Sequence, residues 1–179
     1  MKREVNAFDY AADICKAMPK GILMTTKNGT FVNSMVIGWG HIGIEWGRPI
    51  FVAYVRESRF TKQMVENHGE FTVNVPMGEF DSQIIRICGT KSGRDMDKVR
   101  ELGLHLVESY HVDVPGIREF PLTLECRVIY KQKQDLSAIP EEIISRYYPE
   151  IPGADFDGQN RDYHYAYYGE IVGAYLIEE

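Results

Sequence analysis

The chain is poor in cysteine and has no long run of apolar residues. Its three cysteines, Cys15, Cys88 and Cys126, are far apart and include no C-x-x-C pair. This pattern predicts reduced thiols that pack as small buried hydrophobic side chains. No segment approaches the roughly 18 apolar residues of a membrane-spanning helix, and the first residues lack the apolar stretch of a signal peptide. We therefore expect a cytoplasmic protein that makes no use of a membrane.

The chain also lacks an excess of positive charge and the common nucleotide and hydrolase motifs. It has 20 Lys and Arg against 26 Asp and Glu, which argues against nucleic acid as a general partner. There is no P-loop, no G-x-G-x-x-G and no G-x-S-x-G. The histidines and cysteines show no metal-ligand spacing, and the acidic run at 155–162 has its glycine in the wrong place for a calcium loop. No metal site is predicted.

What the sequence does contain is a series of short alternating or apolar segments that are typical of strands. The pair Asn28-Gly29, between two β-rich runs within 21–40, predicts a hairpin. Further strands are predicted at 48–55, 70–76, 104–112, 121–132 and 163–177, and a loop at 152–162. Helices are predicted at 6–17, at 59–67, at 79–102 in two pieces broken at 89–93, and after Pro140.

These segments amount to about seven strands, joined mostly by hairpins or short helices. A doubly wound parallel sheet needs a regular alternation of strands and helices, and this alternation is missing. The sequence therefore predicts a mainly β fold with flanking helices. The expected architecture is a closed antiparallel barrel with the helices packed outside, as a single domain over residues 1–179.

The link between the strand at 48–55 and the next helix gathers cations and hydroxyls, among them Arg56, Ser58, Arg59 and Thr61. The start of a helix offers free backbone N–H groups and the positive end of its dipole, which favour an anion. Arg56 has a planar fork suited to phosphate, and the two hydroxyls can add hydrogen bonds. The simpler interpretation is that Ser58 caps the helix and the cations are solvated.

A second basic cluster lies at 88–98. Its glycines and Ser92 permit the tight backbone that can hold an anion, while Lys91, Arg94 and Lys98 supply positive charge. The alternative is a solvated turn between two helices, capped by Ser or Asp.

Two strands carry polar side chains in unusual positions. Asn33 interrupts an apolar face that includes Met35 and Trp39, and a buried amide must find partners. Those partners are either a neighbouring backbone or the edge of a flat heteroaromatic ligand lying against Met35 and Trp39. On the last strand, His164 and Glu170 share a face but lie about 20 Å apart unless the strand bulges, so a catalytic dyad is not expected. His164 by itself either contacts a ligand or is an ordinary structural histidine.

Taken together, these features resemble the flavin reductase-like family, the FMN-binding split barrels that include flavoredoxin. The resemblance runs from about Pro19 to Glu179. It is carried by "GILMTT…NSMVIGWG", "VRESRFTKQMVENHGEFTVNVP", "CGTKSGRDMDK" and "HYAYYGEIVGAYL".

The resemblance implies an antiparallel FMN-binding split β-barrel, with the strand from Asn33 to Val36 along the flavin ring. The cation and hydroxyl group at 56–61 would then bind the FMN phosphate. His164 is the candidate catalytic residue. Val36 and Gly38 stand where many relatives carry Thr or Ser. The candidate cofactor-binding residues are Asn33, Ser34, Met35, Val36, Arg56, Ser58, Thr61, Asn74, Ser92 and Lys98.

Three functions are compatible with this resemblance. The first is an NAD(P)H-dependent flavin reductase, with NADH or NADPH as the electron donor. The second is an electron carrier that keeps FMN bound and exchanges electrons with a redox partner protein. The third is a non-enzymatic barrel that binds another phosphorylated heteroaromatic, such as pyridoxal phosphate.

A homodimer with the flavin near the interface is expected from the family and from the tyrosines near the end of the chain. These tyrosines are Tyr147, Tyr148, Tyr163, Tyr165, Tyr167 and Tyr168.

Overall fold

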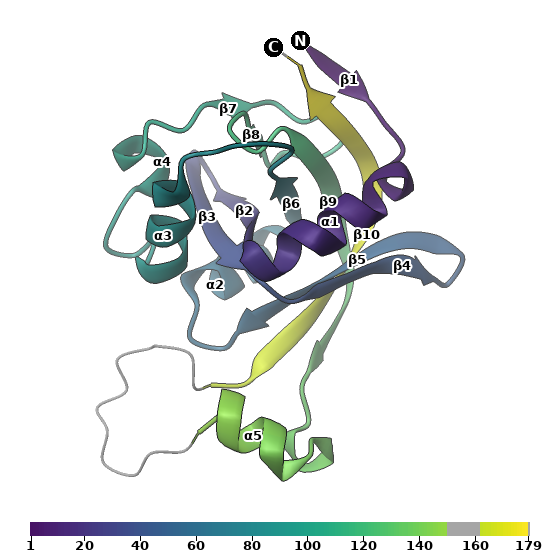
Figure 1. Ribbon diagram of the computed structural model, residues 1–179, viewed down its shortest axis with the longest axis vertical. Coiled ribbons are helices and arrows are strands. Elements are labelled where there is room, and N and C mark those ends of the chain that lie inside the picture. The colour runs from purple at the N-terminus through teal and green to yellow at the C-terminus, as the bar shows by residue number, and fades with distance from the viewer. Residues whose placement is uncertain (150–161, 179) are drawn as a thin grey trace.

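The computed structural model of the protein describes residues 1–149 and 162–178, in which eight strands form one antiparallel sheet (Figure 1). The order along the sheet is β3-β2-β6-β9-β10-β5-β4, and β1 pairs with the far end of β10. These strands are β1 (Lys2–Glu4), β2 (Ile22–Asn28), β3 (Phe31–Ile37), β4 (Gly40–Glu45), β5 (Arg48–Arg56), β6 (Glu70–Val75), β9 (Leu122–Lys133) and β10 (His164–Ile177). A separate pair is formed by β7 (Leu106–Val107) and β8 (Gly116–Ile117).

Five α-helices flank the sheet in the described part of the chain. They are α1 (Ala11–Ala17), α2 (Phe60–His68), α3 (Ser82–Thr90), α4 (Lys98–Glu101) and α5 (Glu141–Tyr147). Short 3₁₀ turns lie at Ala7–Tyr10, Met18–Lys20 and Leu136–Ala138. The predicted mainly β, antiparallel fold with flanking helices is confirmed. The barrel is not closed, however, because β3 and β4 end the strand order and do not pair with each other.

The main core fills the inside of the curled sheet. Large side chains from neighbouring strands meet there, including Phe51, Phe71 and Tyr167, and α1 adds Ile14. A second core joins the outer face of β2 to α3 through Leu23, Ile84 and Cys88, among others. Each fully buried apolar side chain contributes about 1.5–3 kcal/mol of transfer free energy, so the inner cluster is the main source of stability.

The predicted hairpin is confirmed, but its turn differs from the one expected for Asn-Gly. Asn28 pairs with Phe31, so the two loop residues are Gly29 and Thr30. Gly29 has φ 59°, the positive value that the first loop position of a type II′ turn requires. The pairing also fixes which residues of β3 turn their backbone N–H and C=O groups toward β2 and which turn them toward the open edge.

The strand pattern differs from the prediction at two places. The strand predicted at 104–112 is reduced to Leu106–Val107, because the amides of Tyr110 and His111 donate to the buried Glu125 carboxylate instead of to a strand. Strands β1 and β4 were not predicted, since β1 has only three residues and glycines interrupt the apolar pattern of β4. The loop predicted at 152–162 lies outside the described residues, apart from its last residue.

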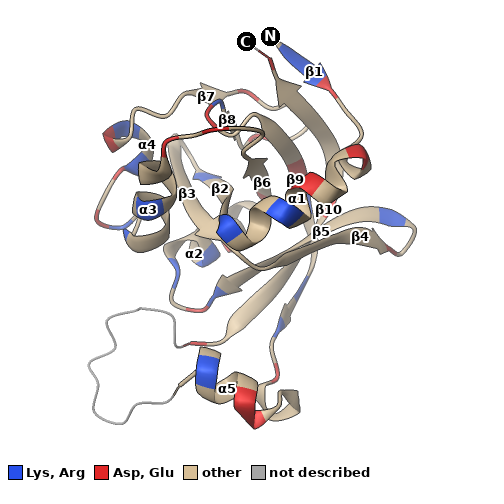
Figure 2. Ribbon diagram, viewed as in Figure 1, with Lys and Arg blue, Asp and Glu red and all other residues tan. Residues whose placement is uncertain are grey.

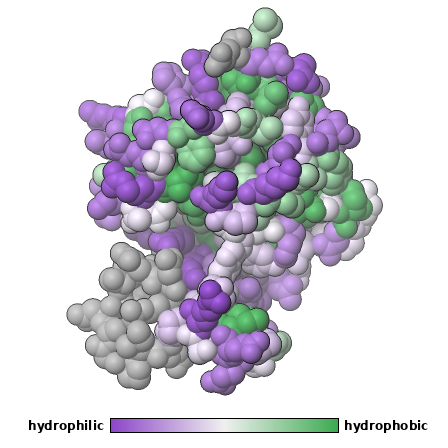
Figure 3. Space-filling view, viewed as in Figure 1, coloured by the Kyte–Doolittle hydropathy of each residue, from purple (hydrophilic) through white to green (hydrophobic). Residues whose placement is uncertain are grey.

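Strands β9 and β10 are long and extend beyond the barrel, where they carry α5 at their far end (Figure 1). The two chain ends lie side by side at the opposite end, in agreement with the pairing of β1 and β10. Basic residues on α2, α3 and α4 lie on one side of the barrel (Figure 2). Elsewhere, apolar side chains are exposed at the tip of the β4–β5 hairpin, where Ile44 is 64% exposed (Figure 3).

Helices in the described ranges are all too short or too polar to cross a membrane. Within the same ranges, no group of three or more His, Cys, Asp or Glu side chains is placed to hold a metal ion. All three cysteines are free. Cys88 and Cys126 are buried as predicted, whereas Cys15 is exposed, because it lies on the solvent side of α1, outside the face that buries Ile14.

Candidate functional site

Two adjacent cavities, here called the first and the second cavity, lie beside the open edge of β3. The first has a volume of about 450 Å³ and lies between β3, the start of α2 and the segment 88–98. The second has a volume of about 350 Å³ and lies between the end of β3, β5, β10 and α5. They share the lining residues Met35, Val36 and Arg59. The two basic segments identified in the sequence thus meet at one place.

Strand β3 presents unpaired backbone groups to these cavities. In a two-residue hairpin the residues that flank the loop form a hydrogen-bonded pair, so Phe31 turns its N–H and C=O toward β2. Alternation then directs the backbone groups of Ser34 and Val36 away from β2, to the edge where no further strand pairs. This edge offers donors and acceptors to a flat ligand that lies alongside it.

The start of α2 differs from the prediction at its cap. The N-cap is Arg59 and not Ser58, and a guanidinium has no acceptor for the first helical amides. The Ser58 backbone N–H donates instead to a carboxylate oxygen of Asp162 at 2.6 Å. At the second residue of the helix, the Thr61 hydroxyl accepts from Asn33 Nδ2 at 2.9 Å. Residues 58–61 line the first cavity, so the positive end of the α2 dipole faces it.

Asn33 is the buried amide that the sequence singled out, and it lines the first cavity. The residue is 1% exposed, and its Oδ1 has no hydrogen-bond partner among the described residues. A buried amide oxygen without a partner costs about 1–3 kcal/mol, so this oxygen favours a ligand that donates a hydrogen bond.

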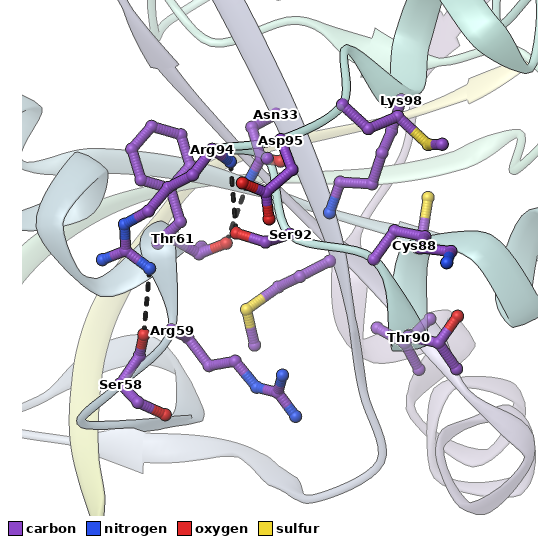
Figure 4. A pocket seen from close by; sticks show the side chains of 17 residues that line it. Asn33, Ser58, Arg59, Thr61, Cys88, Thr90, Ser92, Arg94, Asp95 and Lys98 are labelled. Carbon is purple, nitrogen blue, oxygen red and sulfur yellow. Dashed lines mark hydrogen bonds between the residues drawn. The ribbon is translucent and has the colours of Figure 1, made fainter. Parts of the chain in front are cut away.

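The segment 91–97 closes over the first cavity and is tied to α2 (Figure 4). Arg94 donates to the carbonyl oxygen of Ser58 at 3.2 Å, and its own amide donates to Ser92 Oγ at 3.1 Å. Gly93 passes so close to the barrel that a Cβ there would lie 2.2 Å from Asn33 Oδ1 and 2.9 Å from a ring carbon of Phe60. Only glycine fits at this point, because neither neighbour can move without disturbing α2 or β3.

Lys98 is the most buried cation of the first cavity, with 3% of its surface exposed. It begins α4, where Asp97 caps the helix by accepting from the Arg100 amide at 3.1 Å. A cap by Ser or Asp was the alternative predicted for this segment. Burial, opposed by Cys88 and assisted by the charge of Arg59, lowers the pKa of the Lys98 ammonium to about 8. Burial likewise raises the pKa of the Cys88 thiol. An anion in the cavity would stabilise the charged form of Lys98 and raise its pKa again.

The second cavity has flat aromatic walls and basic side chains. The Trp39 ring lies 4.9 Å from the ring of His164 and meets Tyr147 edge-on at 5.2 Å. Arg56 is 8% exposed and donates to the backbone carbonyls of Asp162 and Tyr147. Its guanidinium is therefore used to hold α5 against β10, and it lines the second cavity, not the first.

His164 is held as a neutral imidazole of defined tautomer. Gln134 Oε1 accepts two hydrogen bonds, one from the His164 amide and one from the Tyr148 hydroxyl at 2.8 Å. The Tyr148 oxygen must then accept from His164 Nδ1, at 2.9 Å, which leaves Nε2 as an acceptor. Burial, with the charges of Arg56 and Arg59, lowers the pKa of His164 to about 3. Glu170 is paired with Arg48 at 2.7 Å, and the bulges in β10 do not bring it to His164.

The structure brings together most of the predicted site residues. Asn33, Met35, Val36, Ser58, Thr61, Ser92 and Lys98 line the first cavity, and Arg56 and His164 line the second together with Met35 and Val36. Ser34 and Asn74 line neither cavity through their side chains. They belong to a buried network in which both bond to the Thr25 hydroxyl, at 2.7 and 2.9 Å, and Asn74 accepts from the Ile117 amide. That network joins β2, β3 and β6 to β8.

Several lining residues were not among the predicted site residues. Arg59 lines both cavities; it was counted in the basic cluster at 56–61 but not chosen as a site residue. Tyr54 and Arg146 also line the second cavity, and nothing in their local sequence indicates this. Arg146 reaches the site because α5 folds back beside β10.

The first cavity combines cations, hydroxyls and an apolar surface. Its basic residues Arg59, Lys91, Arg94 and Lys98 face a single acid, Asp95, among the described lining residues. Met35, Val36 and Met96 supply apolar contact beside the open edge of β3. This set suits a ligand with an anionic group at one end and a flat, hydrogen-bonding ring at the other.

A comparison of the sequence with known protein families identifies the family. The profile described as "Flavin reductase like domain" matches residues 16–179. The chain belongs to the flavin reductase-like family. Among curated proteins, an uncharacterized protein of Archaeoglobus fulgidus is 35% identical over 97 residues, 54% of each chain. An uncharacterized protein of Pyrococcus abyssi is 30% identical over 107 residues, 59% of each chain. The matched stretch thus spans little more than half the length of these relatives.

Solved structures of this family share the fold. The flavoredoxin of Desulfovibrio vulgaris (Miyazaki F) superposes with a TM-score of 0.63 at 22% identity, covering 88% of this chain and 69% of that one. An FMN-binding domain of a flavin reductase-like enzyme from Shewanella baltica gives a TM-score of 0.63 at 18% identity, covering 98% and 77%. The fold is therefore that of the split-barrel flavin reductase-like proteins.

Proposed function

We propose that the protein is an FMN-binding oxidoreductase that reduces flavin at the expense of NADH or NADPH. The first cavity carries this proposal, because the open edge of β3 and the orphaned Asn33 oxygen lie opposite a group of cations and hydroxyls, of which Lys98 and Thr61 are buried. FMN has the matching parts, a flat ring with donors and acceptors along its edge and a terminal phosphate. The family and the FMN-binding structures of the same fold support the choice of this cofactor.

Bound FMN supplies the redox chemistry, and the residues of this chain supply position and charge. Arg59 and Arg94, with the α2 N-terminus, would hold the phosphate, while Ser58, Thr61 and Ser92 offer hydroxyls near it. The backbone N–H and C=O groups of Ser34 and Val36 would bond to the ring edge, so position 36 does not need a hydroxyl side chain.

The second cavity favours a reductase over a flavoredoxin-type electron carrier. It opens onto the same residues Met35 and Val36 that line the first cavity, so a second molecule could lie beside the flavin. Hydride transfer depends chiefly on holding the two reactants at the right distance, which such an arrangement provides. A pure electron carrier has no need of a second ligand cavity.

The test is a titration of the purified protein with FMN, FAD and riboflavin, followed by anaerobic addition of NADH and NADPH. We expect FMN to bind most tightly and one nucleotide to bleach the bound flavin absorbance. Reduction by dithionite but by neither nucleotide would identify an electron carrier instead. A preparation that binds pyridoxal phosphate but no FMN would reject the flavin assignment.

We also propose that the protein forms a homodimer. The tip of the β4–β5 hairpin exposes Ile44 and Trp46, and Trp46 continues into a ring cluster with Tyr130 and Tyr168 at 5.9 and 6.2 Å. Exposed aromatic clusters of this kind suit an interface. Of the six tyrosines considered in the sequence, Tyr148 and Tyr167 are buried within the protomer, so the expected surface is smaller. Light scattering should give twice the 20.6 kDa chain mass, and Trp46→Glu should reduce it to that of one chain.

A further inference from the structure

The charge of the second cavity is positive. Arg56, Arg59 and Arg146 line it, and no Asp or Glu is among its described lining residues. Asp162 lies close by, but its carboxylate accepts from the Ser58 amide, and it interacts with Arg56 through its backbone carbonyl and its charge. Asp162 thus offsets part of the charge of Arg56, and Arg146, which is exposed on α5, is left facing the opening.

The walls of the cavity are flat. Trp39 is 39% exposed, with its ring beside His164 at 4.9 Å and across the edge of Tyr147 at 5.2 Å. Tyr54 meets the ring of His164 edge-on at 6.3 Å. A planar ring that enters this space can stack on Trp39. The volume of about 350 Å³ lies at the lower end of the range for ligand pockets, so the cavity itself holds one small ring, and the rest of a dinucleotide would lie outside it.

His164 adds an acceptor and no charge. The bonds through Gln134 and Tyr148 place the ring proton on Nδ1, which leaves Nε2 able to accept a hydrogen bond. A protonated imidazole would only add a fourth cation. The neutral ring therefore favours a ligand that carries a donor as well as an anionic group.

We propose that the second cavity binds a small planar aromatic carboxylate bearing a hydroxyl or amino substituent. Arg146 and Arg56 attract the carboxylate, Trp39 stacks on the ring, and His164 Nε2 accepts from the substituent. This ligand lies next to the flavin of the proposed function, but its recognition needs only the residues of the second cavity. The binding test is therefore made first on FMN-free protein.

The test uses Trp39 as the reporter. The chain has two tryptophans, so the variant Trp46→Phe leaves Trp39 alone. We expect 3-hydroxybenzoate to quench its fluorescence and to bind at least tenfold more tightly than the uncharged 3-hydroxybenzamide. Benzoate, which lacks the donor, should bind severalfold more weakly than 3-hydroxybenzoate. Equal affinity for the acid and the amide would overturn the proposal.

Variants in the same background separate the contacts. Arg146→Gln should weaken 3-hydroxybenzoate about tenfold, whereas Arg100→Gln, on α4 and outside both cavities, should leave it unchanged. His164→Phe should abolish the preference for the hydroxyl and keep the preference for the carboxylate. Unchanged binding in Arg146→Gln would overturn the proposal, as would quenching of Trp39 by NADPH but not by 3-hydroxybenzoate.

The final step distinguishes this proposal from the proposed function. With FMN added, 3-hydroxybenzoate should shift the flavin absorption bands, because the two cavities share Met35 and Val36. A protein that binds the carboxylate but no FMN would retain this proposal and reject the flavin assignment. A protein that binds FMN, but in which neither Trp39 fluorescence nor flavin absorbance responds to the carboxylate, would retain the flavin assignment and reject this proposal.

Discussion

The two cavities share one strand edge but are built for different kinds of ligand. The first is made of short polar side chains, glycines and cations that belong to the start of α2 and the segment 88–98, with Lys98 as its buried cation. The second is made of large rings and arginines that come from β5, β10 and the outlying helix α5. The first therefore resembles a permanent site for a phosphorylated cofactor, whereas the second resembles a site for an exchanging molecule. The difference shows that one open strand edge can border two cavities of different chemistry.

The sharpest way to break the first cavity without touching the second is Gly93→Ala. The added Cβ would lie 2.2 Å from Asn33 Oδ1, so the segment must move away from β3. Overpacking of this kind costs about 1–3 kcal/mol, and we expect FMN affinity to fall about 10- to 100-fold. The matched control is Gly43→Ala, where an added Cβ meets nothing within 4 Å. Equal FMN affinity in the two variants, measured by flavin fluorescence, would contradict the role given to this approach.

Lys98→Met should separate stability from binding in the first cavity. The folded pKa of about 8 lies below the ordinary value of 10.5, so burying the charged amine destabilises the FMN-free protein at pH 7 by about 3 kcal/mol. The methionine should therefore raise the free energy of unfolding by up to about that amount and weaken FMN about tenfold. Urea denaturation and flavin titration measure the two effects.

The lowered pKa of Lys98 also predicts how stability and FMN affinity depend on pH. Between pH 8 and 10.5 the unfolded chain holds more protons at Lys98 than the folded chain, so stability without FMN rises with pH across this window. FMN affinity should fall above pH 8, because Lys98 must regain its proton to pair with the ligand. A Lys98→Met protein that keeps the same pH profile would show that another group is responsible.

Arg59 and Arg56 test the boundary between the cavities. Arg59→Met should weaken FMN about tenfold more than riboflavin, because only FMN carries the phosphate. Arg56→Met should weaken both flavins alike and lower the melting temperature, because Arg56 holds the carbonyls of Tyr147 and Asp162. The sequence alone assigned the phosphate to Arg56. If Arg56→Met weakened FMN much more than riboflavin, Arg56 would be assigned to the phosphate again.

His164 should give the smallest effect on turnover and the clearest effect on acid stability. We expect His164→Phe to change kcat/KM a fewfold, mainly through KM, since the neutral imidazole seats a ligand and supplies no acid. A fall of 10²–10⁴ would instead indicate general acid–base catalysis. Because the pKa of folded His164 is about 3, the unfolded chain holds more protons from pH 3 to 6.5. The wild-type protein should therefore lose stability as pH falls through this window, and the variant should lose less.

The sequence predicted the parts of the first cavity because they lie on local signals. Alternating strands, a hairpin marked by Gly29 and a basic helix start are short-range patterns, and each survives in the structure. The family resemblance supplied the split barrel, and the fold agrees. The single-domain assignment and the cytoplasmic location remain predictions.

What the sequence determined by itself was the set of strands and the presence of two cationic segments, because side-chain periodicity and turn chemistry act over a few residues. Only the tertiary structure decided which cation belongs to which cavity. Arg56 and Arg59 are three residues apart, yet Arg56 donates to backbone carbonyls of residues that lie 91 and 106 positions away in the sequence. Ser34 and Asn74 were likewise drawn into a network with β8. Such contacts depend on chain segments that meet only after folding, so no local pattern encodes them.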